Sequence, residues 1–249
     1  SLFSLLAGKE DEDDFLGVEV LPGRMRSHKE KEMRLQEACV RFNKLAGIRF
    51  EELFSQNDMN MIIINKGKTG QLLELALGMH LSSTNLDFDD GELRTNKCDN
   101  AGNPKQTVFI TQISSVIDEL IQERPFEETH LYEKISNILY VPVCKDGNPK
   151  DWMFLPSIHI DLSSPRYAQL RDIWRSDYYS ICRQLRMHIE TSPDRRIHTS
   201  NGQHIQVRSK DSMPYRPIYS GVYGRNVSNK NHAFYFRKEF VYDIRSMSR

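Results

Sequence analysis

The sequence predicts a mixed α/β fold, in which short strands and amphipathic helices are interleaved along the chain. The clearest helix follows Ser164-Pro165, where apolar residues recur three or four positions apart. The clearest buried strand is the apolar run 138–143, which is rich in strand-forming residues. The chain has 249 residues, of which 39% are hydrophobic and 27% charged, so it can bury a substantial core.

The N-terminal part divides into a lead segment and the start of a domain. An acidic run, 9–14, is followed by sequence containing Gly and Pro, so we expect residues 1–28 to form an acidic lead segment with little regular structure. The remaining residues, 29–249, are expected to form one domain. Because the chain begins with Ser1 instead of Met, it is also expected to be trimmed or part of something longer.

Three helical segments are expected in the first third of that domain. Residues 29–45 carry a helical apolar stripe that ends before Gly47, and residues 50–54 can add one or two further turns. Residues 69–77 follow a small, basic loop and also show a helical pattern.

The central part is expected to contain strands. Residues 92–98 and 107–111 have strand-like patterns, and the turn-forming residues 99–104 between them predict a hairpin. The run 138–143 then forms the buried strand.

The C-terminal part begins with the long helix. Its apolar stripe consists of Tyr167, Leu170, Trp174, Tyr178, Ile181, Leu185 and Ile189. Alternating residues predict a strand over 204–208, a last strand is expected at 234–236, and a closing helix is expected over 238–247.

The net charge of zero hides an asymmetry between the two halves. Residues 1–130 carry 15 basic and 23 acidic side chains, whereas residues 131–249 carry 19 basic and 11 acidic ones. From Arg183 onward there are 13 basic and 5 acidic residues. Such a basic region favours an anionic partner such as a nucleic acid backbone, although basic residues that merely coat a solvated surface would give the same count.

The sequence lacks the features of secreted and membrane proteins. No apolar run approaches the ~20 residues that span a bilayer, and the N-terminus lacks the basic region of a secretory signal. The four cysteines lie far apart with no C-x-x-C pair, which favours a reducing compartment over a disulfide framework or a zinc site. We expect a cytoplasmic, nucleoid-associated bacterial protein.

An acidic group precedes the strand at 92–98. Asp87 lies in a turn shortly before Glu92 and Arg94, which share one face of the strand because side chains alternate. Two carboxylates arranged in this way can bind Mg²⁺, which neutralises a phosphodiester and activates water. Spacing alone equally allows an acidic turn leading into a solvated strand.

From about Leu35 to Phe240, the chain resembles the MutH-type mismatch-repair endonucleases and the related GATC-cutting type II restriction endonucleases. Both have the restriction-endonuclease-like fold, a mixed central sheet flanked by helices. The matching stretches occur in family order: LAG at 45–47, EEL at 51–53, KGKTGQLLE at 66–74, GELRT at 91–95, GNP at 102–104, TVF at 107–109, HLYEK at 130–134, LYVPV at 139–143, LRDIW at 170–174, QVRSK at 206–210 and FYFRKEF at 234–240.

The resemblance implies catalytic roles. Asp87 and Glu92 are implied as Mg²⁺ ligands, with Glu74 in support, whereas Glu74 could instead be an exposed helix residue. Lys134 is implied as the second active-site lysine, whereas it could instead be a surface lysine.

The resemblance also implies DNA contacts. Lys66 and Lys68 are implied as phosphate contacts. Arg208 is implied to contact a guanine through O6 and N7, with Lys210 beside it at the base or phosphate edge. Tyr235 is implied at the adenine region, where methylation is sensed. Phe109 is implied near the same bases, and for these two aromatic residues the alternative is core packing.

Two positions depart from the family pattern. The catalytic Glu-x-Lys of the family is here Glu92-x-Arg94, and arginine cannot exchange protons near neutral pH. Lys97 cannot substitute, because it points to the opposite face of the strand. Arg94 could therefore be an engineered inactivating change, a native variant of lower turnover, or the sign of a domain that binds without cutting. The spacing before Glu92 is also short, so Asp89 or Asp90 could be the ligand instead of Asp87.

Two functions follow from these expectations. The first is a Mg²⁺-dependent DNA endonuclease for GATC-like sites in double-stranded DNA, more typical of restriction than of mismatch repair, with a homodimer as one expected assembly. The second is a catalytically silent, allosteric DNA-binding module of a duplicated restriction enzyme.

Overall fold

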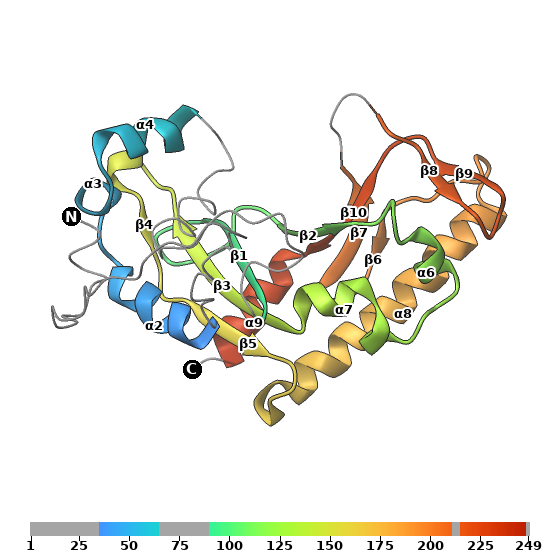
Figure 1. Cartoon of the computed structure of the whole chain (residues 1–249), viewed down its shortest axis with the longest axis horizontal. Coiled ribbons are helices and arrows are strands. Elements are labelled where there is room, and N and C mark those ends of the chain that lie inside the picture. Colours follow the sequence, from blue (N-terminus) through green and yellow to red (C-terminus); the bar gives the residue numbers. More distant parts are fainter. Residues whose placement is uncertain (1–34, 65–89, 211–214, 248–249) are drawn as a thin grey trace, which may run out of the picture.

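The computed structural model describes residues 35–64, 90–210 and 215–247 (Figure 1). Residues 1–28 and the helix expected over 69–77 lie outside these ranges. The described ribbon forms two arms that diverge from a shared centre, one carrying the N-terminal helices and the other the long helix and the C-terminal strands (Figure 1). No helix among the described residues is long and apolar enough to cross a membrane.

The first sheet is organised around one buried strand. Its strands are β1 (Glu92–Cys98), β3 (Asn137–Cys144), β4 (Met153–Phe154) and β5 (Ile158–Asp161). β1 pairs with β3 in parallel, whereas β4 and β5 pair with β3 in antiparallel. The strand expected at 138–143 is confirmed, and it is apolar throughout because one face packs into each of the two core clusters.

The second sheet contains the C-terminal strands. Its order is β2 (Val108–Gln112), β10 (His232–Phe236), β7 (Ile205–Ser209) and β6 (Ser200–Asn201), and all the pairings are antiparallel. A separate pair is formed by β8 (Ile218–Ser220) and β9 (Arg225–Ser228). The expected central sheet is thus divided into two larger sheets within the described residues.

The hairpin expected between 92–98 and 107–111 is wrong, although the turn between them is tight. The Asp99 carboxylate accepts the N–H groups of Ala101 and Asn103, and Gly102 has a φ of +80°. Beyond one isolated bridge between Cys98 and Pro104, however, β1 pairs with β3 and β2 pairs with β10. The turn chemistry was correct, but strand pairing is a long-range property.

The expected helices are confirmed where they are described, and several short ones appear in addition. The α-helices are α2 (Leu35–Leu45), α3 (Phe50–Leu53), α4 (Gln56–Ile64), α6 (Ile117–Ile121), α7 (His130–Ile135), α8 (Ala168–Thr191) and α9 (Lys238–Met247), and the 3-10 turns are η1 (Phe126–Glu128), η2 (Pro149–Asp151) and η3 (Pro165–Tyr167). The stripe of α8 packs into the larger core cluster, as its periodicity predicts.

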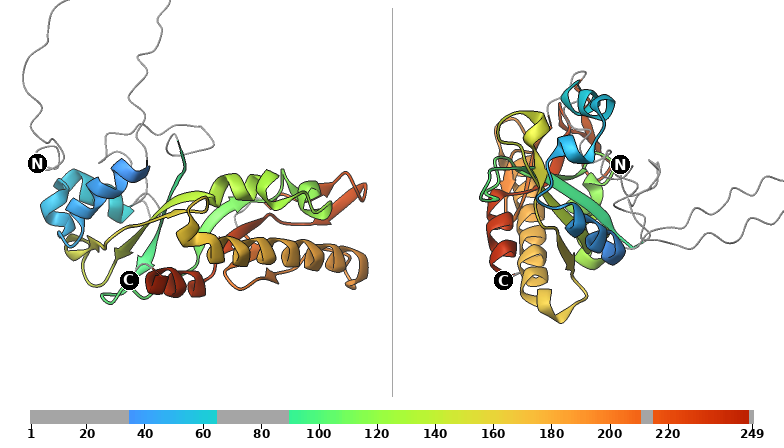
Figure 2. Two further views of the ribbon diagram at one scale, coloured as in Figure 1. Left: turned by 90° about the horizontal axis from the view of Figure 1, so that it is seen from below. Right: turned by 90° about the vertical axis from the view of Figure 1, so that its left-hand side faces the viewer.

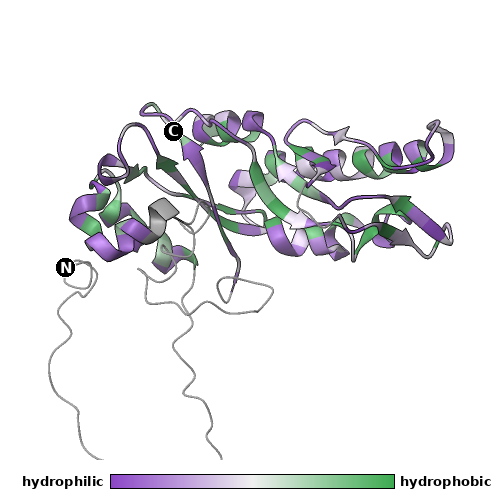
Figure 3. Cartoon of the chain, turned by 90° about the horizontal axis from the view of Figure 1, so that it is seen from above, coloured by the Kyte–Doolittle hydropathy of each residue, from purple (hydrophilic) through white to green (hydrophobic). Residues whose placement is uncertain are grey.

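The centre of the molecule brings the two sheets together. β1 lies against β2, and α7 packs on both β2 and β3 (Figure 1). Two perpendicular views show that α8 and α9 lie along one side of the strands (Figure 2). Several strands and one side of the helices carry hydrophobic residues, whereas β1 is largely hydrophilic (Figure 3). Glu92, Arg94 and Lys134 meet at the junction of β1, β2 and α7.

Candidate functional site

Glu92 is a buried carboxylate at the start of β1. In the parallel register with β3, it lies beside Ile138, and Arg94 lies beside Tyr140, so both side chains face the larger core cluster. The Glu92 side chain is only 3% exposed. A buried carboxylate needs cationic or hydrogen-bonding partners to offset the cost of its desolvation. The side chains that bind Glu92 are therefore part of the site.

Each oxygen of Glu92 is bound by a cation. The Nζ of Lys134 donates to Oε1 at 2.6 Å, and Nη1 of Arg94 donates to Oε2 at 3.2 Å. We call Glu92, Arg94 and Lys134 the Glu92 cluster. The Lys134 side chain is 15% exposed and binds this buried carboxylate, so it differs from the exposed lysines of the described surface.

Arg94 connects the two sheets. Besides Glu92, its guanidinium donates to the carbonyl of Leu93 at 3.1 Å and to the carbonyl of Ile110 on β2 at 3.2 Å. The pairing of β2 with β10 shifts by one residue at Ile110, between Phe109 and Thr111. Arg94 thus links the carboxylate on β1 to an irregular point of the neighbouring strand.

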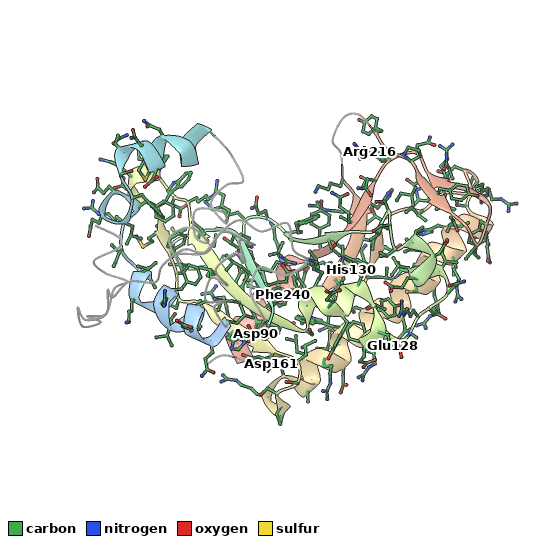
Figure 4. All side chains as sticks on the ribbon, in the orientation of Figure 1. Asp90, Glu128, His130, Asp161, Arg216 and Phe240 are labelled. Atoms are coloured by element: carbon green, nitrogen blue, oxygen red, sulfur yellow. The ribbon has the colours of Figure 1, made fainter. Side chains whose placement is uncertain are left out.

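Lys134 is held in place by the helix that carries it. α7 begins after Thr129, whose hydroxyl accepts the N–H of Tyr132, an ordinary N-cap. The Nε2 of His130 lies 3.1 Å from the Thr111 hydroxyl on β2. Figure 4 shows His130 at the centre of the molecule, where α7 meets the second sheet. Short as it is, α7 therefore gives the Lys134 side chain a defined direction.

Four further predicted residues meet on one face of the second sheet. In register, Tyr235 on β10 lies opposite Phe109 on β2, and their rings contact edge to face with centroids 5.7 Å apart. Arg208 on β7 lies with its guanidinium carbon 4.1 Å from the centroid of the Tyr235 ring, and Lys210 Nζ lies 4.1 Å from that of Phe109. We call these four residues the aromatic–basic cluster.

The cluster is ordered and partly open to solvent. Each cation–π contact contributes about 0.5–2 kcal/mol and fixes a long side chain in one direction. Phe109 is 39% exposed, so it is not a core residue, whereas Tyr235 lies at 9% beneath Arg208. The opposite face of the same strands packs into the core through Val207, Phe234 and their neighbours.

One donor of the Arg208 side chain is used within the chain itself. Its Nη2 donates to the Thr107 hydroxyl at 2.8 Å, while its buried Nε has no hydrogen-bond acceptor among the described residues. The bond to Thr107 and the contact with the Tyr235 ring hold the guanidinium in one direction.

The remaining predicted residues lie outside the described part of the chain. They are Lys66, Lys68, Glu74, Asp87 and the alternative ligand Asp89. The other alternative, Asp90, is described, and its carboxylate accepts the N–H of Leu35 at 3.0 Å at the described start of α2 (Figure 4). Asp90 therefore has a structural partner on a different element from the Glu92 cluster.

The described side chains would supply part of a metal site. Glu92 supplies the hard carboxylate oxygens that Mg²⁺ prefers, and these accept from Lys134 and Arg94. No group of three His, Cys, Asp or Glu side chains able to hold a metal occurs among the described residues. Glu92 is thus chemically suited to the ion, whereas Asp87, Asp89 and Glu74 lie outside the described residues.

Sequence reasoning missed three partners in this region. Thr107, the Ile110 carbonyl and His130 hold Arg208, Arg94 and α7, respectively. All three interactions are long-range in sequence, and two of the partners belonged to stretches quoted only for their resemblance. No local pattern signals such contacts.

The mixed sheets and helices, with a buried carboxylate–lysine pair beside an aromatic and basic surface, are compatible with an endonuclease-like fold. No family model matches the chain. The chain is similar to the DNA mismatch repair protein MutH of Buchnera aphidicola subsp. Baizongia pistaciae, with 27% identity over 218 residues, covering 82% of this chain and 93% of that protein. This distant similarity runs over most of the chain and supports the MutH-like resemblance of the motifs.

Proposed function

We propose that the chain is a Mg²⁺-dependent, sequence-specific DNA endonuclease that hydrolyses phosphodiesters at GATC-like sites. The observation that carries the proposal is the convergence of the Glu92 cluster and the aromatic–basic cluster at one junction, linked through Arg94 and Ile110. The similarity to MutH favours a nuclease and a DNA partner.

The aromatic–basic cluster would bind the bases. A guanidinium can donate two hydrogen bonds to O6 and N7 of guanine, and Arg208 is held for this by Tyr235 and Thr107. The exposed ring of Phe109 offers an apolar surface to neighbouring bases, and Lys210 adds a positive charge for the base or phosphate edge. The undescribed Lys66 and Lys68 are proposed as further phosphate contacts.

The Glu92 cluster would carry the chemistry. Mg²⁺, held by Glu92 and Asp87, would neutralise charge on the phosphodiester and lower the pKa of a bound water. Lys134 would orient the attacking water and stabilise the charge that develops on the phosphate oxygens, because its ammonium is fixed by Glu92. Glu74 is proposed to support this arrangement.

Arg94 specifically favours a second candidate. A guanidinium that binds Glu92, Leu93 and Ile110 at once is a structural link, and it cannot act as a proton carrier. The chain could thus be a catalytically silent, allosteric DNA-binding module of a duplicated restriction enzyme, in which the Glu92 cluster stabilises the sheets.

The two candidates are separated by restoring the family lysine. Purified Arg94→Lys protein is incubated with Mg²⁺ and duplexes that contain one GATC site, and the products are resolved under denaturing conditions. Nicking or cutting at the site, with a 5′-phosphate and a 3′-hydroxyl, supports the endonuclease. A folded Arg94→Lys protein that binds but never cleaves these duplexes supports the silent module.

A restriction role is proposed over a repair role because of the acidic lead segment, which is an addition to the compact repair enzymes. The same assay, run on unmethylated, hemimethylated and fully methylated duplexes without added proteins, tests this. A restriction enzyme should cut without partners, as a homodimer where both strands are cleaved, whereas a repair enzyme should prefer hemimethylated DNA and depend on other proteins.

A further inference from the structure

The charge around Glu92 bears on how the chain binds DNA. An unpaired carboxylate repels an approaching phosphate, and this repulsion is strong where water is excluded. In a metal-dependent site, a divalent ion removes the repulsion. Here the described residues of the Glu92 cluster comprise one carboxylate and two cationic side chains.

We propose that Arg94 and Lys134 take over this neutralising role, so that the chain binds DNA with the same affinity in the presence and in the absence of divalent ions. The inference rests on the DNA binding of the proposed function, and it concerns binding instead of cleavage. It holds for both the endonuclease and the silent module.

Arg94 is suited to permanent neutralisation. The guanidinium stays protonated at any physiological pH. Its side chain is 12% exposed and has acceptors on β1 and β2, so its charge is fixed next to Glu92. The compact ammonium of a lysine at this position lacks the planar fork of donors that reaches Glu92 and Ile110 together.

The neutralised carboxylate also lies close to the aromatic–basic cluster. Ile110, to which Arg94 donates, is the chain neighbour of Phe109 in the aromatic–basic cluster. Bases that contact Arg208 and Phe109 would bring their phosphates toward β1 and α7. The sign of the charge there consequently affects binding as well as chemistry.

The experiment measures the dissociation constant of a fluorescent GATC duplex at one fixed ionic strength, with EDTA and with Ca²⁺. The proteins are the native chain, Arg94→Gln and the control Lys97→Gln. The control removes one positive charge from the same strand but from its opposite face. Lys134→Gln is a second test variant, and thermal melting identifies any variant that fails to fold.

The native chain and Lys97→Gln should bind equally in EDTA and in Ca²⁺. Arg94→Gln should lose at least about tenfold in affinity in EDTA, because one of the two positive charges beside Glu92 is lost, and should recover it in Ca²⁺. Lys134→Gln should likewise lose affinity in EDTA and recover it in Ca²⁺. If Arg94→Gln does not fold, this variant alone tests the inference.

Three results would overturn the inference. Native protein that binds only with Ca²⁺ shows that the cations do not replace the ion, while the proposed function stands. A folded Arg94→Gln or Lys134→Gln protein that binds equally well in EDTA and Ca²⁺ shows that these side chains are not the neutralising groups. Native protein that binds no DNA in either condition contradicts the proposed function itself.

Discussion

Lys134 Nζ donates to Oε1 of Glu92 at 2.6 Å, across 42 residues of sequence. One partner lies on a strand of the first sheet and the other on the short helix α7. Since the pair is buried, each side chain orients the other. The pair gives the junction of β1, β2 and α7 a fixed arrangement of charge, on which the predictions below depend.

Lys134→Gln should lower the cleavage rate of Arg94→Lys protein by about 10²-fold in saturating Mg²⁺, because a fixed positive charge near the phosphate is lost. The measurement is the initial rate of nicking of a GATC duplex. Lys150→Gln, which changes an exposed lysine of η2, is the control and should leave the rate unchanged. Equal rates for both variants would remove Lys134 from the proposed chemistry.

Arg208→Ala should reduce discrimination between a GATC duplex and a duplex with one altered base pair by about 1–3 kcal/mol. The reason is that a bidentate contact with guanine is lost. Competition binding at constant salt measures the difference. Arg183→Ala, which changes an arginine that is 60% exposed on α8, should weaken binding to both duplexes equally or not at all. Unchanged discrimination in Arg208→Ala would assign base contacts to other residues.

Asp177→Ala should destabilise the fold by about 2–4 kcal/mol. The Asp177 carboxylate is buried within α8 and accepts the N–H groups of Gln203, His204 and Ile205, where β7 begins. Equilibrium urea unfolding gives the change in free energy.

The matched control for this substitution is Asp172→Ala on the same helix. Asp172 is 71% exposed and forms a surface ion pair with Arg175. Its removal should change the stability by less than about 0.5 kcal/mol. A similar loss in both variants would show that the three N–H groups at the start of β7 do not depend on Asp177.

The thiols should differ sharply in reactivity. Burial raises the pKa of Cys98 to about 12 and that of Cys182 to about 12, so their reactive thiolate is scarce at about pH 8. The half-buried Cys39 should be alkylated first by iodoacetamide, and the buried cysteines only after unfolding. Peptide mass spectrometry over time measures the order. Rapid alkylation of Cys98 in the folded protein would contradict its burial at the end of β1.

The sequence predicted those elements whose signal is local. The bounds of β1 and the helix α9 agree with the expected 92–98 and 238–247, and the stripe of α8 is buried as its spacing implied. The turn at 99–104 was also recognised from its residues. Local patterns did not predict strand partners, so β1 was paired wrongly with β2 instead of β3.

The contacts of the candidate site residues were not predictable from the sequence. Motif resemblance singled out Glu92, Lys134 and Arg208, and the structure brings the first two together. The link from Arg94 to Ile110 depends on a register shift in β2, and the support of Arg208 by Thr107 depends on how β2 and β7 are placed in one sheet. Both are consequences of tertiary packing, which no short motif encodes.

The central claim is that the second sheet recognises a DNA sequence. The most direct test is a binding titration of the native chain with a duplex containing one GATC site and with the same duplex in which that site is permuted, at one salt concentration. We predict that the GATC duplex binds about 10³-fold more tightly. Equal affinity for the two duplexes, or no binding to either, would contradict the account.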